Sequence, residues 1–343
     1  MQNNGRKKLR GGVDLFHNIV SIHNLLLAWK EFCRGKRKKE DVANFEMHLE
    51  DNIWQLHGEL ISGNYKMMPY ISFYVCDPKR RNIHKANVRD RIVHQAIFRI
   101  LYPICDLDFI FDSFSSRTKK GTHLGTRRLF KACRKVTKNW RENAWVLQFD
   151  IKKFFDSVDH YILLEQIFLL IHEEKTLLLL QSIISSFEKT KDRGIPLGNV
   201  TSQLFANVYM NKFDQFVKHE LEVENYFRYC DDVAITHKSR EYLLRILEQC
   251  ENFLKNEMKI FLHPQKTNIR KVRQGIDFLG YVILPNSIIL RTHTKHRIEK
   301  RLDNVELQSL ISYFGVTKHA RARELREKIY KRIIFFKNLV TST

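Results

Sequence analysis

The sequence predicts a mixed α+β protein with a helical head, a mixed centre and a basic helical tail. Apolar residues recur at helical spacing over 17–62, and from 291 onward the pattern is again helical and rich in Lys and Arg. Between these segments, short runs of β-branched and aromatic residues predict strands. A chain of 343 residues is long enough for two or three lobes, each with its own core.

The sequence predicts individual helices and strands along the chain. The basic run 34–39 splits the helical head, and residues 70–85 are typical of a hairpin with its turn at Asp77-Pro78. Further helices are expected over 88–102, 160–186, 200–222 and 240–258, and further strands over 145–150, 226–229, 233–237 and 276–290.

Two adjacent acids stand at the tip of one expected hairpin. The run YFRYCDDVAI places Asp231 and Asp232 between two β-prone segments. Burying two carboxylates costs several kcal/mol per charge unless cations compensate, and the turn lacks the Asn-Gly that favours tight hairpins. A pair of divalent ions used in phosphoryl transfer would explain both acids. The alternative is a solvated acidic turn.

A third acid, Asp150, ends the apolar run 145–149. Carboxylates at the ends of two strands converge if those strands are neighbours in one sheet. Asp150, Asp231 and Asp232 could then hold two Mg²⁺ ions, which prefer oxygen ligands. Asp156 and Asp159 compete for this role but fit better at a helix N-terminus, where Asp is a favoured cap.

The charge balance indicates a polyanionic partner. The chain has 59 Lys and Arg against 38 Asp and Glu, a net charge of +21, and nucleic acid is the usual partner of such a surface. Solubility is the alternative reason. Six scattered cysteines without a CxxC pair argue against zinc and for a reducing compartment, the cytoplasm. Charged residues interrupt the apolar stretch 162–180, and the N-terminus lacks a signal peptide, so no membrane association is expected.

Several other motifs could contact a substrate. Gly198, in a loop before the helix expected from 200, would let a base or sugar approach the backbone, although such loops are also simple turns. Phe155 could exclude a 2′-hydroxyl, or it could be a core aromatic. Lys79 and Arg81 lie in a basic hairpin that could grip a triphosphate, or form a solvated turn.

The remaining basic candidates could contact the template or primer, or protonate the leaving group. Residues 115–123 contain Arg117, Lys119 and Lys120, which could contact nucleic-acid backbone. Lys266 could protonate departing pyrophosphate as a general acid. Each could equally be an ordinary surface cation.

These motifs together resemble the reverse transcriptases. Asp150 with Phe155, the PLG-x₃-SQ segment, YCDD, Lys266-Thr267 and DFLGY at 277–281 stand in the order of that family's palm motifs, and 80–97 resembles the fingers of bacterial members. The resemblance implies a right-hand polymerase fold with two Mg²⁺ ions (Mn²⁺ being possible), and it implies nucleic-acid binding at Gly280. The implied divisions are a helical extension over 1–65, fingers over 66–144 with a helical insertion over 160–195, an antiparallel-sheet palm over 145–285, and a helical thumb over 286–343.

The loop before the helix expected from 200 indicates which group of reverse transcriptases the chain resembles. Group II intron enzymes usually have QG-x₃-SP before the palm helix, whereas this chain has Leu197-Gly198 and then Ser202-Gln203. That variant resembles the diversity-generating retroelement enzymes, in which an aliphatic residue is associated with error-prone copying of template adenines. Because Leu cannot hydrogen-bond near the incoming nucleotide as Gln can, looser positioning would lower discrimination.

The retroelement resemblance implies partners as well as an activity. It implies a template RNA, cDNA, dNTPs and an accessory variability protein, a small basic helical oligomer. Two alternatives remain. One is a bacterial reverse transcriptase of ordinary fidelity, of the phage-defence or group II intron type. The other is a non-catalytic RNA-binding scaffold, against which the complete set of three acids argues.

Overall fold

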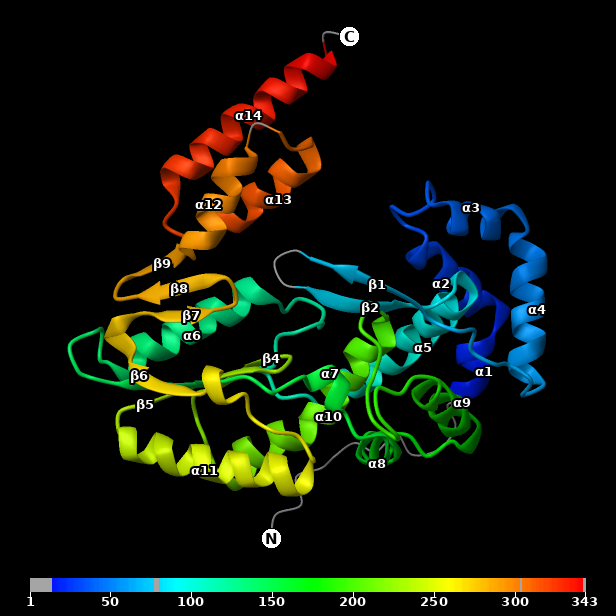
Figure 1. Cartoon of the computed structure of the whole chain (residues 1–343), viewed down its shortest axis with the longest axis horizontal. Coiled ribbons are helices and arrows are strands. Elements are labelled where there is room, and N and C mark those ends of the chain that lie inside the picture. Colours follow the sequence, from blue (N-terminus) through cyan, green and yellow to red (C-terminus); the bar gives the residue numbers. More distant parts are fainter. Residues whose placement is uncertain (1–13, 77–79, 303, 342–343) are drawn as a thin grey trace. The chain divides into compact units, whose positions relative to one another are not determined.

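The computed structural model describes residues 14–76, 80–302 and 304–341, with the side chains of 337–341 left out (Figure 1). The expected turn at Asp77-Pro78 and the candidate Lys79 lie outside the described residues. The chain forms two compact units. The first comprises residues up to Phe109 with Lys153–Phe213 and Met258–Ile260, and the second comprises Ile110–Lys152, Asp214–Glu257 and the chain from Phe261 onward.

The first unit begins with the expected helical head. The four helices of the head are α1 (Leu15–Val20), α2 (Ile22–Phe32), α3 (Glu40–Met47) and α4 (Leu49–Ile61). Asp14 and Ser21 cap α1 and α2 by accepting backbone N–H bonds, and the basic run 34–39 joins α2 to α3. Helix α5 (Val88–Asp106) packs on α2, where the buried Asn24 amide donates to the carbonyl of Ala96. Helix α5 runs past the expected end at 102, and Pro103 lies within it although proline usually ends or kinks a helix.

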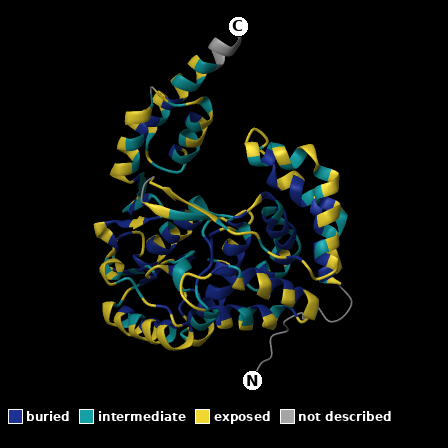
Figure 2. Ribbon diagram, turned by 45° about the vertical axis from the view of Figure 1, so that its right-hand side comes forward, coloured by how far each residue is buried: buried dark blue, intermediate teal, exposed yellow. Residues whose placement is uncertain are grey.

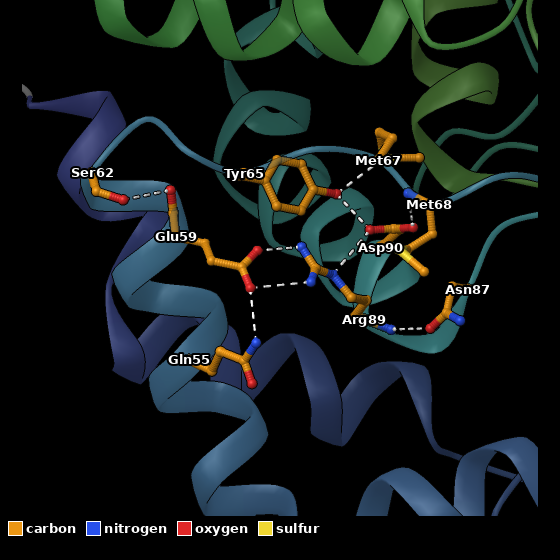
Figure 3. Close-up of polar contacts among 9 residues, drawn as sticks. All are labelled: Gln55, Glu59, Ser62, Tyr65, Met67, Met68, Asn87, Arg89 and Asp90. Carbon is orange, nitrogen blue, oxygen red and sulfur yellow. Dashed lines mark hydrogen bonds and ion pairs between the residues drawn. The ribbon is translucent and has the colours of Figure 1, made fainter.

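A buried polar cluster ties the entry of the expected hairpin to α5 (Figure 3). The Asp90 carboxylate accepts the Tyr65 hydroxyl at 2.9 Å and the Met68 N–H at 3.0 Å, and burial raises its pKa. Beside it, Arg89 forms a forked ion pair with Glu59. The hairpin strands β1 (Ile71–Val75) and β2 (Arg81–Lys85) then pair antiparallel as expected, with every residue of β1 exposed (Figure 2).

The second half of the first unit is helical. It holds α7 (Phe154–Ser157), α8 (His160–Leu170), α9 (Glu174–Ser185) and most of α10 (Val200–Gln215). The helix expected over 160–186 is two helices, because Ile171 is extended and the Glu173 carboxylate bonds to the Phe16 N–H at 2.6 Å. Asp159 caps α8 as expected, accepting from the N–H groups of Tyr161 and Ile162.

The second unit is built on an antiparallel sheet of order β4-β5-β3-β6. Its strands are β3 (Trp145–Phe149), β4 (Tyr226–Tyr229), β5 (Asp232–His237) and β6 (Asn268–Lys271). Helices α6 (Thr122–Val136) and α11 (Arg240–Glu257) cover opposite faces of this sheet (Figure 1). The core on the α6 side includes Leu129, Cys133, Val146, Phe227 and Ala234. The expected helix 200–222 ends as a π-helical turn, Phe216–Glu220.

A second antiparallel sheet and three helices complete this unit. The sheet contains β7 (Ile276–Phe278), β8 (Tyr281–Leu284) and β9 (Ser287–Leu290), and the helices are α12 (Thr292–Arg301), α13 (Leu307–Thr317) and α14 (Arg323–Thr341). The expected basic helical tail is therefore confirmed, with its own core around Leu310 and Ile329. Within the described ranges no helix is both long and apolar enough to cross a bilayer, and all six cysteines are unpaired.

Candidate active site

Sheet register brings the three acids together. Strand β3 pairs with β5 so that Phe149 lies opposite Val233, and β4 turns into β5 with Tyr229 opposite Asp232. Asp150 follows Phe149 directly, so it stands beside the start of β5. Asp150 lies close enough to Asp232 for its charge to raise the pKa of that acid. The expectation that the two acidic strands are neighbours is thus confirmed.

The pKa values of two of the acids, Asp231 and Asp232, are raised. Loss of hydration, followed by repulsion from Asp231 and Asp150, raises the pKa of Asp232 to about 7. Loss of hydration and the Asp150 charge also raise the pKa of Asp231. Carboxylates gathered in this way favour either a shared proton or a bound cation.

Lys266 lies directly at this cluster. Its Nζ is 2.6 Å from Oδ2 of Asp150. A short 3₁₀ turn, Pro264–Lys266, presents the lysine, and the His263 N–H fixes that turn by donating to the Asp150 carbonyl at 2.8 Å. The lysine and the three acids therefore form one charged group.

The donors of this group suit Mg²⁺, because all three acids offer carboxylate oxygens. Within residues 14–76, 80–302 and 304–341, no three His, Cys, Asp or Glu side chains are already arranged as a complete set of metal ligands. Instead, the Lys266 ammonium supplies the positive charge beside Asp150. A divalent cation would relieve the same repulsion, so the charge pattern fits a metal whose binding rearranges these side chains.

Beneath the acidic turn lies an ion pair that sequence analysis missed. The Arg228 guanidinium donates to both carboxylate oxygens of Asp214, at 2.7 and 2.6 Å, and both side chains are 0% exposed. The same guanidinium donates to the Cys230 carbonyl at 2.9 Å. The sequence does show an arginine within the otherwise aromatic strand YFRY. A buried charge requires a partner, so this arginine could have predicted an ion pair.

The turn itself is strained at Cys230, whose φ is +56°. Residues other than Gly, Asn and Asp rarely adopt this left-handed conformation, which costs on the order of 1 kcal/mol. The hydrogen bond from Arg228 to the Cys230 carbonyl helps to hold the strained turn in place.

Leu197 and Gly198, the candidate substrate-binding residues in the loop before α10, lie in the first unit. The Leu197 carbonyl accepts the His84 N–H of β2 at 3.0 Å. Gly198 has φ +122°, and an added Cβ would meet the Ile83 side chain at 3.1 Å. Strand β2 is therefore the part of the molecule that approaches the backbone closely at Gly198. Arg81 starts β2, Phe155 is half-buried in α7 against Phe154, and Gln203 is exposed on α10.

The nucleic-acid candidates of the second unit lie mainly in a loop before α6. Arg117 donates to the carbonyls of Ile110 and Ser113, and Lys120 donates to the Phe111 carbonyl while its Nζ lies 3.3 Å from the Phe111 ring centre. These two side chains stabilise the loop, whereas Lys119 is exposed. Gly280, with φ +88°, forms the two-residue turn between β7 and β8.

Comparison with known families identifies the class. The family described as reverse transcriptase (RNA-dependent DNA polymerase) matches residues 77–283. This match covers more than half of the chain and includes all three acids and Lys266. The chain therefore belongs to the reverse transcriptase family, the RNA-directed DNA polymerases.

Individual relatives are similar to large parts of the chain. Protein YkfC of Escherichia coli is 27% identical over 270 residues, which cover 67% of this chain and 70% of YkfC. The group II intron-encoded protein LtrA of Lactococcus lactis is 24% identical over 337 residues, which cover 76% of this chain and 54% of LtrA. Among solved structures, telomerase from Candida albicans shares the fold, with a TM-score of 0.53, 13% identity and coverage of 81% of this chain and 55% of that one.

Proposed function

We propose that this chain copies a template RNA into cDNA by phosphoryl transfer at Asp150, Asp231 and Asp232, which would hold two Mg²⁺ ions or, in their place, Mn²⁺. The observation that carries the proposal is the pairing of β3 with β5, which sets Asp150, at the end of β3, beside Asp232, at the start of β5. When bound, the ions would lower the pKa of the attacking hydroxyl and neutralise the leaving pyrophosphate.

The chain's own residues would perform the rest of the reaction. Lys266 pairs with Asp150. Once cations occupy the acids, its ammonium would be free to give a proton to the departing pyrophosphate. Phe155 would exclude a 2′-hydroxyl, and Lys79 and Arg81 would hold the triphosphate. Arg117, Lys119, Lys120 and Gly280 would lie along the template and primer.

The proposed divisions follow the right-hand polymerases. The extension would cover 1–65, the fingers 66–144 with the insertion 160–195, the palm 145–285 and the thumb 286–343.

Primer extension tests the catalytic assignment. Full-length protein with a primed RNA template, dNTPs and Mg²⁺ should make cDNA, and Asp231→Asn should abolish synthesis without unfolding the protein. Asp51→Asn, at an exposed Asp of α4, is the matched control and should retain activity. Full activity of Asp231→Asn would disprove the assignment.

We also propose that the enzyme is of the error-prone retroelement type and works with an accessory variability protein. The support is the loop with Leu197-Gly198 and Ser202-Gln203. Sequencing of the cDNA should show errors directed to template adenines, and Leu197→Gln should reduce them. The similarity to LtrA favours the alternative, a group II intron-type or phage-defence enzyme of ordinary fidelity. For such an enzyme the adenine errors would be absent and Leu197→Gln would change nothing.

A further inference from the structure

Helix α6 presents two contrasting faces. Its inner face, with Leu129, Ala132, Cys133 and Val136, packs into the core against the β4-β5-β3-β6 sheet. Its outer face is exposed and cationic. We call this surface the α6 basic face, and it consists of Arg127, Arg128, Lys131, Arg134, Lys135 and, in the turn that follows, Lys138.

The charged residues of helix α6 itself all have the same sign. Helix α6 contains five Lys and Arg and no Asp or Glu. Helix α11, which covers the opposite face of the same sheet (Figure 1), carries three Lys and Arg with four Glu. Solubility needs only mixed charges such as those of α11. The helix dipole favours cations in the last turn, and so accounts for Arg134 and Lys135 but not for the others.

Three of these cations form one line. Arg127, Lys131 and Arg134 are spaced by four and three residues, which places them on one side of the helix. At 1.5 Å per residue, the line is about 10 Å long, and Lys138 follows in the turn after the helix. A rigid row of charges of this length suits a regular phosphate backbone.

Existing partners leave the row available. Lys135 pairs with Glu224, and Lys138 pairs with Glu142. Both pairs are exposed and so contribute only about 0–1 kcal/mol each. Phosphate could therefore replace the glutamates at little cost in free energy. Throughout the described part of the chain, Lys131 and Arg134 have no acidic partner, and Arg134 donates to the Asn139 side chain instead.

The row ends in a hollow. Lys131, Arg134, Lys135, Lys138 and Asn139 line an open hollow of about 270 Å³. Cations and one amide form this lining, without a carboxylate, so the hollow suits an anionic group such as a phosphate.

The hollow is remote from the catalytic acids within the same unit. The turn after α6 leads to Trp145 at the start of β3, whereas Asp150 follows the other end of that strand. Five strand residues span about 17 Å. A ligand on the α6 basic face would therefore bind away from the reacting groups.

The side chains of the α6 basic face favour a double-stranded over a single-stranded nucleic acid. Single strands are held by exposed aromatic rings on which bases stack. Here Phe130 is half-buried and packs against the core with Trp140. The exposed ring beside the face, Phe111, already has the cations of Arg128 and Lys120 over it. Duplex RNA is recognised through its backbone and shape. We infer that the α6 basic face binds the backbone of a double-stranded segment of the template RNA, an inference that rests on the proposed function.

Salt-dependent binding tests this inference. The variant Lys131→Gln/Arg134→Gln removes two cations from the face, and Arg245→Gln/Lys255→Gln removes two exposed cations from α11 as a matched control. Binding of full-length protein to a labelled RNA hairpin of about 16 base pairs is measured between about 50 and 200 mM KCl. The α6 variant should lower the slope of log K against log salt by about 1.5 and weaken binding about tenfold, while the control should match wild type.

Two further measurements separate the possible failures. Extension of a primer on a short unstructured RNA should be equal in both variants and wild type, because neither variant touches the acids. Wild-type RNA binding and slope in the α6 variant would overturn the inference, and so would a loss confined to a DNA duplex of the same sequence. Absence of extension by wild type, with the α6 effect intact, would instead overturn the proposed function alone.

Discussion

The Arg228 guanidinium lies against the Asp214 carboxylate in a forked ion pair that excludes solvent completely. Burial opposes the arginine charge, but the charge and hydrogen bonds of Asp214 outweigh it and raise the pKa of Arg228. Because Arg228 also donates to the Cys230 carbonyl, the pair connects the end of α10 to the turn that carries the acids.

Removal of one partner should destabilise the protein strongly. Arg228→Met leaves the Asp214 carboxylate buried without its cation, and we expect a loss of about 3–5 kcal/mol in the free energy of unfolding. Denaturant titration measures this loss. A change below about 1 kcal/mol would show that the pair contributes little.

Replacement of both partners should separate stability from activity. Arg228→Met/Asp214→Leu substitutes an apolar pair of similar volume, so stability should recover most of the loss. About 1–3 kcal/mol should remain lost because the buried Tyr226 hydroxyl loses its acceptor, Asp214. Primer extension should stay slow through a lower kcat, with KM for dNTP little changed, because the Cys230 carbonyl has lost its donor. A refolded double variant with wild-type kcat would rule out positioning of the turn by Arg228.

The acids should make stability depend on pH in the absence of metal. With a pKa near 7 for Asp232, the folded protein keeps a proton between about pH 4 and 7 that the unfolded chain has already lost. Rising pH therefore destabilises the fold across this window, and the loss is complete above it. Asp232→Asn should be more stable than wild type in EDTA at about pH 8, by about 1 kcal/mol because the residue is partly screened by solvent. At about pH 4 the two should be equal. A difference that does not vary with pH would contradict this expectation.

Divalent cations should stabilise the folded protein through the same acids. A ligand at one hundred times its Kd adds about 2.7 kcal/mol, so Mg²⁺ should raise the Tm of wild type at neutral pH by several degrees. Asp231→Asn/Asp232→Asn should not respond, and NaCl of equal ionic strength is the control for screening. An equal Tm increase in the double variant would place the cation elsewhere.

The turn between β7 and β8 should depend on glycine for its backbone conformation. An added Cβ at Gly280 meets nothing within 4 Å, but φ is +88°, so Gly280→Ala should cost about 1–2 kcal/mol through strain. Gly58→Ala is the control, since Gly58 lies within α4, has open space and has an ordinary φ. That variant should be neutral or more stable by up to about 1 kcal/mol. Thermal unfolding compares the two, and an unaffected Gly280→Ala protein would show that the turn tolerates the strain.

The sequence predicted the elements with strong local patterns. The β-prone runs on either side of Asp231 and Asp232 located that hairpin, and the neighbouring position of the strand before Asp150 followed from the shared chemistry of the acids. Helical periodicity located the head and the tail.

What the sequence did not predict depends on contacts between distant residues. Strand β6 is four residues long, NIRK, and has no apolar alternation, so only its pairing with β3 defines it. The bond between Glu173 and the Phe16 N–H, 157 residues apart, helps to end one helix that periodicity extends. The pairing of Arg228 with Asp214 likewise needs the strand and the end of α10 to be folded together.

The pairing order of the catalytic sheet has a consequence for synthesis on the ribosome. Strand β3 is central, but its partner β6 begins at Asn268, 119 residues after Phe149 (268 − 149). At 5–20 residues per second, β3 would wait roughly 6–24 s for that partner. During this interval its apolar residues and unpaired backbone groups would be open to chaperones or to other nascent chains.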